Sequence, residues 1–75
     1  MRLSEFHRAV REEFGGVHGP VLVRELWLTA CASTAEEALR SGIAPREVWN
    51  ALCDEMNVPS TQRHGRGLKN PVEQA

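Results

Sequence analysis

The sequence has few of the residues from which membrane segments, disulfide frameworks and aromatic binding surfaces are built. It contains two tryptophans, two phenylalanines, no tyrosine and two cysteines among 75 residues. No apolar run approaches the roughly 20 residues that span a bilayer, and the start, Met-Arg-Leu-Ser-Glu-Phe, lacks the apolar core of a secretory signal. We therefore expect a cytoplasmic protein that does not insert into a membrane.

Metal binding and nucleophilic catalysis lack the side-chain patterns that they require. His7, His18, His64, Cys31 and Cys53 show none of the short spacings that are typical of zinc sites, so no metal is expected. Both cysteines fall on apolar faces of predicted helices. This placement predicts buried thiols rather than a disulfide or a catalytic thiolate.

Carboxylates and glycines are not arranged for catalysis or for nucleotide binding either. The adjacent pairs Glu12-Glu13 and Glu36-Glu37 would point about 100° apart on a helix, so neither forms a carboxylate dyad. Gly15-Gly16 does not follow a predicted strand, as the glycines of a phosphate-binding loop do. We expect no cofactor and no enzymatic activity.

What the sequence does have is one small unit with an uneven charge distribution. A chain of 75 residues forms one domain and buries only about 60% of its unfolded surface. The net charge is −1, but residues 1–59 carry six arginines against nine acidic residues, whereas residues 60–75 carry three basic residues against one. The sequence predicts a single helical domain over residues 1–59 and a flexible basic tail over residues 60–75.

The first and third predicted helices have recognisable ends. The first runs from about Glu5 to Phe14, with Ser4 as its N-cap and Gly15-Gly16 as its stop. The third is short, because it begins at the capping box Ser33-Thr-Ala-Glu36 and Gly42 ends it about two turns later.

The second predicted helix, from Pro20 to Ala32, is the most apolar segment of the chain. Proline suits the first helical position, and most of the following side chains, Trp27 among them, fall on one broad face. Val21 and Leu28 fall instead on the side of Arg24. Either the fold covers these two residues from a second direction, or they are open to a partner.

The fourth predicted helix runs from Pro45 to about Met56, and Ile43 can pack on Val48 at its start. Its inner stripe consists of Val48, Trp49, Leu52, Cys53 and Met56.

Together these segments predict an all-α fold, a compact bundle of three longer helices plus one short helix, with a disordered C-terminal tail. The alternative is a strand from Val21 to Thr29, where branched and aromatic residues are dense, although a lone strand has no partner. If the second helix is buried, Trp27→Ala should cost about 3–5 kcal/mol of stability.

Two stretches of the sequence resemble a known family. They are Met-Arg-Leu-Ser-Glu-Phe at the start and Pro-Arg-Glu-Val-Trp-Asn-Ala-Leu-Cys-Asp-Glu-Met-Asn-Val-Pro from Pro45 to Pro59. Over about residues 1–59 the chain is similar to the short actinobacterial proteins of the Domain of Unknown Function 3046. The resemblance implies a small cytosolic helical protein without an assigned activity. Genes of this family often lie near those for the recombinase and its regulator, and this association suggests a role near DNA repair.

The third and fourth helices have the residue types of a helix-turn-helix unit. Ala38, Gly42 and Val48 supply the small residue, the turn glycine and the branched residue that let two helices cross closely. Arg46 and Asn50 would then face a DNA groove. An ordinary helical hairpin with a glycine turn has the same pattern.

The basic tail contains further candidate contacts to nucleic acid. Arg63, Arg66 and Lys69 could contact phosphates as a flexible arm, or could simply keep the chain soluble. Against DNA binding, Glu47, Asp54 and Glu55 on the fourth helix would repel phosphates.

We therefore expect a non-catalytic protein-interaction module, through a partner protein or self-association, with Val21, Arg24 and Leu28 as the candidate interface. The alternative is a helix-turn-helix-like nucleic-acid-binding module with a role near DNA repair or recombination. Binding by the first should be insensitive to salt, whereas binding by the second should weaken as salt rises.

Overall fold

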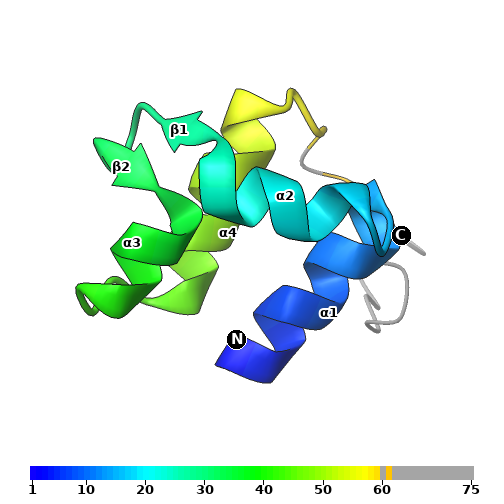
Figure 1. Ribbon diagram of the computed structural model, residues 1–75, viewed down its shortest axis with the longest axis horizontal. Coiled ribbons are helices and arrows are strands. Elements are labelled where there is room, and N and C mark those ends of the chain that lie inside the picture. Colours follow the sequence, from blue (N-terminus) through cyan, green and yellow to red (C-terminus); the bar gives the residue numbers. More distant parts are fainter. Residues whose placement is uncertain (60, 62–75) are drawn as a thin grey trace.

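The computed structural model describes residues 1–59 and 61, which form four helices and one small hairpin (Figure 1). Along the chain these elements are α1 (Leu3–Phe14), α2 (His18–Glu25), β1 (Trp27–Leu28), β2 (Ser33–Thr34), α3 (Ala35–Arg40) and α4 (Pro45–Glu55). The prediction of a mainly helical fold is confirmed, but the all-α class is not, because β1 and β2 form an antiparallel sheet. The predicted flexible tail lies outside the described residues except for Thr61.

Helix α1 lies close to its predicted range, but a different residue caps it. Arg2, rather than Ser4, is the N-cap, and its backbone N–H donates to Oε1 of Glu5 at the third helical position over 2.7 Å. The C-terminal end is as expected. Gly15 adopts φ +96°, which favours glycine, and its N–H donates to the carbonyl of Arg11.

The segment from Pro20 to Ala32 differs most from its predicted structure. Helix α2 ends at Glu25, and Leu26 is extended. The chain then enters β1, which pairs in register with β2 through Trp27 opposite Thr34 and Leu28 opposite Ser33. The single long helix is therefore wrong, and the strand alternative is correct for two residues, because residues 33 and 34 supply the partner strand.

A four-residue loop, residues 29–32, closes this hairpin. The N–H of Ala32 donates to the carbonyl of Leu28 over 2.8 Å, and Ala32 adopts φ +54°, a left-handed conformation that is unusual for alanine. The N–H of Thr29 donates to Oε1 of Glu55 over 3.0 Å. This bond joins the loop to the end of α4 across 26 positions of sequence.

Helix α3 begins one residue later than its predicted capping box. Thr34, rather than Ser33, is the N-cap, and its Oγ1 accepts from the N–H of Glu37 over 3.3 Å. The predicted stop at Gly42 is confirmed: this residue adopts φ +104°, and the N–H of Ile43 donates to the carbonyl of Ala38. This is the bond pattern of a Schellman motif.

Helix α4 confirms its prediction and ends with a second motif of the same kind. Pro45 occupies its first turn and Ile43 is half-buried just before it. At the far end Asn57 adopts φ +59°, and the N–H of Val58 donates to the carbonyl of Cys53 over 2.9 Å. Val58 is thereby turned back into the core.

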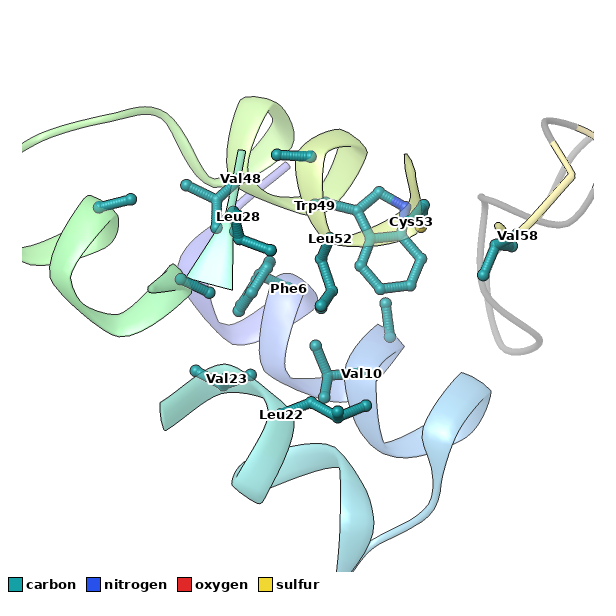
Figure 2. Close-up of a cluster of buried hydrophobic side chains, with 14 residues drawn as sticks. Phe6, Val10, Leu22, Val23, Leu28, Val48, Trp49, Leu52, Cys53 and Val58 are labelled. Carbon is teal, nitrogen blue, oxygen red and sulfur yellow. The ribbon is translucent and has the colours of Figure 1, made fainter. Parts of the chain in front are cut away.

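The core lies where α1, α2, β1, α3 and α4 meet (Figure 2). Trp49 is 1% exposed, and its ring forms T-shaped contacts with Phe6 and Phe14 at centroid distances of 6.3 and 6.2 Å. Leu28 is fully buried, whereas its neighbour Trp27 is 59% exposed. The prediction that Trp27 is a core residue is therefore wrong. Adjacent residues of a strand point to opposite faces, and here the leucine faces inward.

The length and composition of the helices bear on the prediction about membranes. Among residues 1–59 and 61, no helix combines the length and the apolar character that crossing a bilayer requires.

Candidate functional site

Among the described residues, helices α1, α2 and α3 form a groove at the surface. It consists of two open cavities of about 230 and 350 Å³. Both cavities are lined by His7, Val23 and Glu36, one residue from each helix, so they adjoin. The name groove is used below for these two cavities and their lining residues: Leu3, His7, Val10, Arg11, Pro20, Val23, Arg24, Glu36, Leu39 and Arg40.

Helical periodicity explains why each helix contributes a set of neighbouring residues. On α1 the lining residues Leu3, His7 and Val10 are spaced by four and three positions, which places them on one face. The same spacing relates Pro20 and Val23 on α2. In Figure 1, α2 passes above α1, and α3 lies to one side of both. The groove is therefore a product of the assembly of three helices.

The floor of the groove is apolar and continuous with the core. Val10 and Val23 are 2% and 7% exposed, and Figure 2 shows both pointing into the space between α1 and α2. Leu39 is half-buried against the core, and Leu3 at one end is 49% exposed. An apolar side chain of a bound molecule could therefore replace water over Leu3 and Leu39, which favours binding.

The rim of the groove is basic. Arg11, Arg24 and Arg40 line it, against Glu36 as its one acidic residue. Glu36 and Arg40 form an exposed ion pair, with 3.6 Å between Nη2 and Oε2. Within residues 1–59 and 61, Arg11 and Arg24 make no ion pair. Two guanidinium groups are therefore available to a negatively charged ligand.

The dimensions and chemistry of the groove suit side chains of a peptide. Pockets for small molecules and cofactors usually enclose most of the ligand, whereas these two adjoining cavities are open. The lining includes neither a cysteine nor a serine that could act as a nucleophile. The groove can bind a molecule by apolar contact and by charge.

Only one of the three residues predicted as a protein interface lies in this groove. Arg24 lines it and is exposed, while Val21 is half-buried elsewhere on α2. Leu28 is 0% exposed and belongs to the core. Its place in the predicted interface is therefore wrong, because the hairpin carries Leu28 away from the side of Arg24.

The structure describes some of the residues that were predicted for nucleic-acid binding. Ala38 and Val48 are buried and Gly42 forms the turn between α3 and α4, as the helix-turn-helix pattern requires. Arg46 and Asn50 are exposed on α4. The three predicted contacts in the tail, Arg63, Arg66 and Lys69, lie outside the described residues.

The cysteines do not form a reactive centre. Both are free thiols; Cys53 is buried and Cys31 is half-buried. Burial raises the pKa of the Cys31 thiol, and the negative charge of Glu47 raises it further, so this thiol is protonated at neutral pH. In the described part of the chain, no three His, Cys, Asp or Glu side chains gather as a metal site would require.

Sequence reasoning missed most of the groove. It assigned no binding role to Leu3, His7, Leu39 or Arg40. The available signal was the alternation of apolar and basic residues at helical spacing on α1. That signal gains meaning only when α2 and α3 are known to lie beside it.

Comparison with known proteins yields one match. No curated protein and no solved structure matches the chain at a significant level. The family model described as "Protein of unknown function (DUF3046)" matches residues 1–61 and so covers all the described residues. The resemblance carried by the start of the chain and by the α4 motif is thereby confirmed, and the chain belongs to the DUF3046 family.

Proposed function

We propose that the protein is a non-catalytic protein-interaction module whose binding site is the groove between α1, α2 and α3. One observation carries the proposal: an apolar floor, open at Leu3, lies beside the unpaired guanidinium groups of Arg11 and Arg24. Exposed apolar area with a polar rim is the usual form of a protein-binding surface. A cytoplasmic location accompanies this proposal, because two free thiols suit a reducing compartment.

Residues of the groove are accessible without disturbing the core, so the proposal can be tested by substitution. Leu3 is half-exposed at one end of the groove, and a lysine there would place a charge over the apolar floor. Val17 is 86% exposed and does not line the groove. Val17→Lys is therefore a matched control for Leu3→Lys, since both variants exchange an exposed aliphatic residue for the same cation.

The experiment is a selection of random peptides, displayed on phage, against the full chain. We expect enriched peptides that bind the wild-type protein and the Val17→Lys variant but lose most of their affinity for Leu3→Lys. Circular dichroism should show that both variants fold. If no enriched peptide distinguishes the two variants, the groove is not a protein-binding site and the proposal fails.

Nucleic-acid binding is the second candidate function, and a specific observation favours it. Ala38, Gly42 and Val48 occupy the buried and turn positions of a helix-turn-helix unit, with Arg46 and Asn50 exposed on the second helix. The acidic residues Glu47 and Asp54 on the same helix oppose nucleic-acid binding, since their negative charges would lie near phosphates.

The second candidate is tested by an NMR titration of the labelled full chain with a mixed-sequence DNA duplex at low and physiological salt. Binding through α4 predicts shifts at the amides of Arg46 and Asn50 that diminish as salt rises. The variant Arg46→Gln should reduce them, whereas Arg24→Gln should not. An unchanged spectrum at low salt would exclude this function.

A further inference from the structure

We infer that the occupant of the groove is an amphipathic helix of another protein whose apolar face is flanked by acidic residues. This inference rests on the proposed function and specifies the partner for the same site. It is drawn from the charge of the rim, the division of the groove into two cavities and the elements that form its walls.

The charge of the rim selects the sign of the occupant. Arg11, Arg24 and Arg40 stand around the groove, and Glu36 is already paired with Arg40 over 3.6 Å. The rim therefore carries a net positive charge although the whole chain has a formal net charge of −1. Carboxylates of a partner would find the guanidinium groups of Arg11 and Arg24 without breaking an ion pair of residues 1–59 and 61.

The shape of the groove selects the form of the occupant. Two adjoining cavities, with Val10 and Pro20 at one and Leu3 and Leu39 at the other, suit successive apolar side chains of one segment. A helix presents such side chains at positions i, i+3 or i+4, and i+7, which is how amphipathic helices bind hydrophobic grooves. The walls are helices, and the strands β1 and β2 do not line the groove, so no strand edge is available there for an extended peptide.

The same charges disfavour the chain's own C-terminal segment as the occupant. Residues 60–75 contain Arg63, Arg66 and Lys69 against Glu73 alone, so the segment and the rim have the same sign. Like charges brought together at an interface oppose binding. A partner with acidic flanks has the complementary sign.

The test uses the full chain and three synthetic helical peptides labelled with fluorescein. Each peptide carries leucines at positions i, i+4, i+7 and i+11 and differs only in its flanking residues, which are glutamate, glutamine or lysine. Fluorescence anisotropy gives the dissociation constants. Exposed ion pairs each add a factor of about 1.5 to 5 in affinity, so two or three pairs predict roughly tenfold tighter binding of the glutamate peptide than of the glutamine peptide.

The decisive measurement reverses the charge of the groove's rim. Arg11→Glu combined with Arg24→Glu should weaken the glutamate peptide by at least about tenfold and make the lysine peptide the better ligand. Arg46→Glu, which reverses an exposed arginine on α4 outside the groove, should change neither affinity by more than about twofold. Should the double reversal unfold the chain, the neutral variant Arg24→Gln tests the same preference with a smaller change.

Each remaining outcome overturns the inference. Equal binding of the glutamate and glutamine peptides would remove the acidic partner but leave the proposed function intact, because the leucines would still bind the groove. Failure of all three peptides would refute an amphipathic helix, while the display selection decides separately whether the groove binds any peptide. Tighter binding of a peptide of residues 60–75, or a self-association that competes with the glutamate peptide, would assign the groove to the chain itself.

Discussion

The two tryptophans provide a direct test of the fold, because sequence and structure place one of them differently. Trp49 is 1% exposed and meets Phe6 and Phe14, whereas Trp27 is 59% exposed on the hairpin. A helix from Pro20 to Ala32 would bury Trp27; a helix that ends at Glu25 leaves it outside. Replacing each tryptophan by alanine makes the same chemical change at the two positions.

The magnitudes follow from the buried area. A tryptophan buries up to about 250 Å², which at about 25 cal/mol per Å² corresponds to roughly 6 kcal/mol as an upper limit. For Trp49 we expect a loss of about 3–5 kcal/mol, the usual range for a buried aromatic residue. At roughly 0.05–0.15 kcal/mol per residue, a chain of this size has about 4–11 kcal/mol of stability in total. Trp49→Ala should therefore remove much of it, whereas Trp27→Ala should cost about 1 kcal/mol.

Urea denaturation followed by far-ultraviolet circular dichroism measures both losses, with Trp49→Phe as a milder variant in case Trp49→Ala is unfolded in water. Acrylamide quenching of tryptophan fluorescence gives an independent check, because Trp27 should be quenched and Trp49 protected. If Trp27→Ala costs as much as Trp49→Ala, the hairpin is wrong and the long second helix is right.

Three further substitutions test local features. Ala32→Gly should stabilise the fold by about 0.5–1 kcal/mol, because alanine is strained at φ +54° and glycine is not; a thermal melt that shows a loss would contradict this conformation. Gly19→Ala should destabilise by about 1–3 kcal/mol in urea denaturation, since the added Cβ would lie 2.8 Å from Cγ1 of Val10; an unchanged midpoint would mean that α1 and α2 lie further apart. The bond from the backbone N–H of Arg2 holds the pKa of Glu5 below its ordinary value, so the charged carboxylate stabilises the fold at neutral pH and this contribution is lost as the pH falls through the folded-state pKa. Glu5→Gln should therefore lower the melting temperature at neutral pH and converge with the wild type in acid; a constant difference would exclude the linkage.

Local signals in the sequence were sufficient for α1, α3 and α4. Pro45 at the first turn of α4, the stop at Gly42 and the stripe through Trp49 each have a physical cause within a few residues of the chain. Where capping was misassigned, the error was of one or two residues. Arg2 and Thr34 are the N-caps in place of Ser4 and Ser33, because adjacent polar residues offer alternative starts to a helix.

The hairpin could not be predicted in the same way, because its determinants are distant or unusual. The run Leu26-Trp27-Leu28 is compatible with a helix or a strand, and short apolar runs do not distinguish the two. Neither Gly nor Asn marks the left-handed residue of the turn, which is Ala32. The bond from Thr29 to Glu55 joins positions 26 apart, and no local pattern reveals it.

The hairpin also explains why the candidate site differs from the predicted one. With a helix through Ala32, Leu28 would stand beside Arg24 and form an exposed apolar patch on α2. The hairpin instead sends Leu28 into the core and reverses the chain, so that α3 returns to contact α2. The basic side of α2, at Arg24, then acquires its apolar neighbours from Leu3 on α1 and Leu39 on α3. Affinity for an acidic amphipathic helix should accordingly depend on the hairpin as much as on the groove residues themselves, because the turn at residues 29–32 determines where α3 lies.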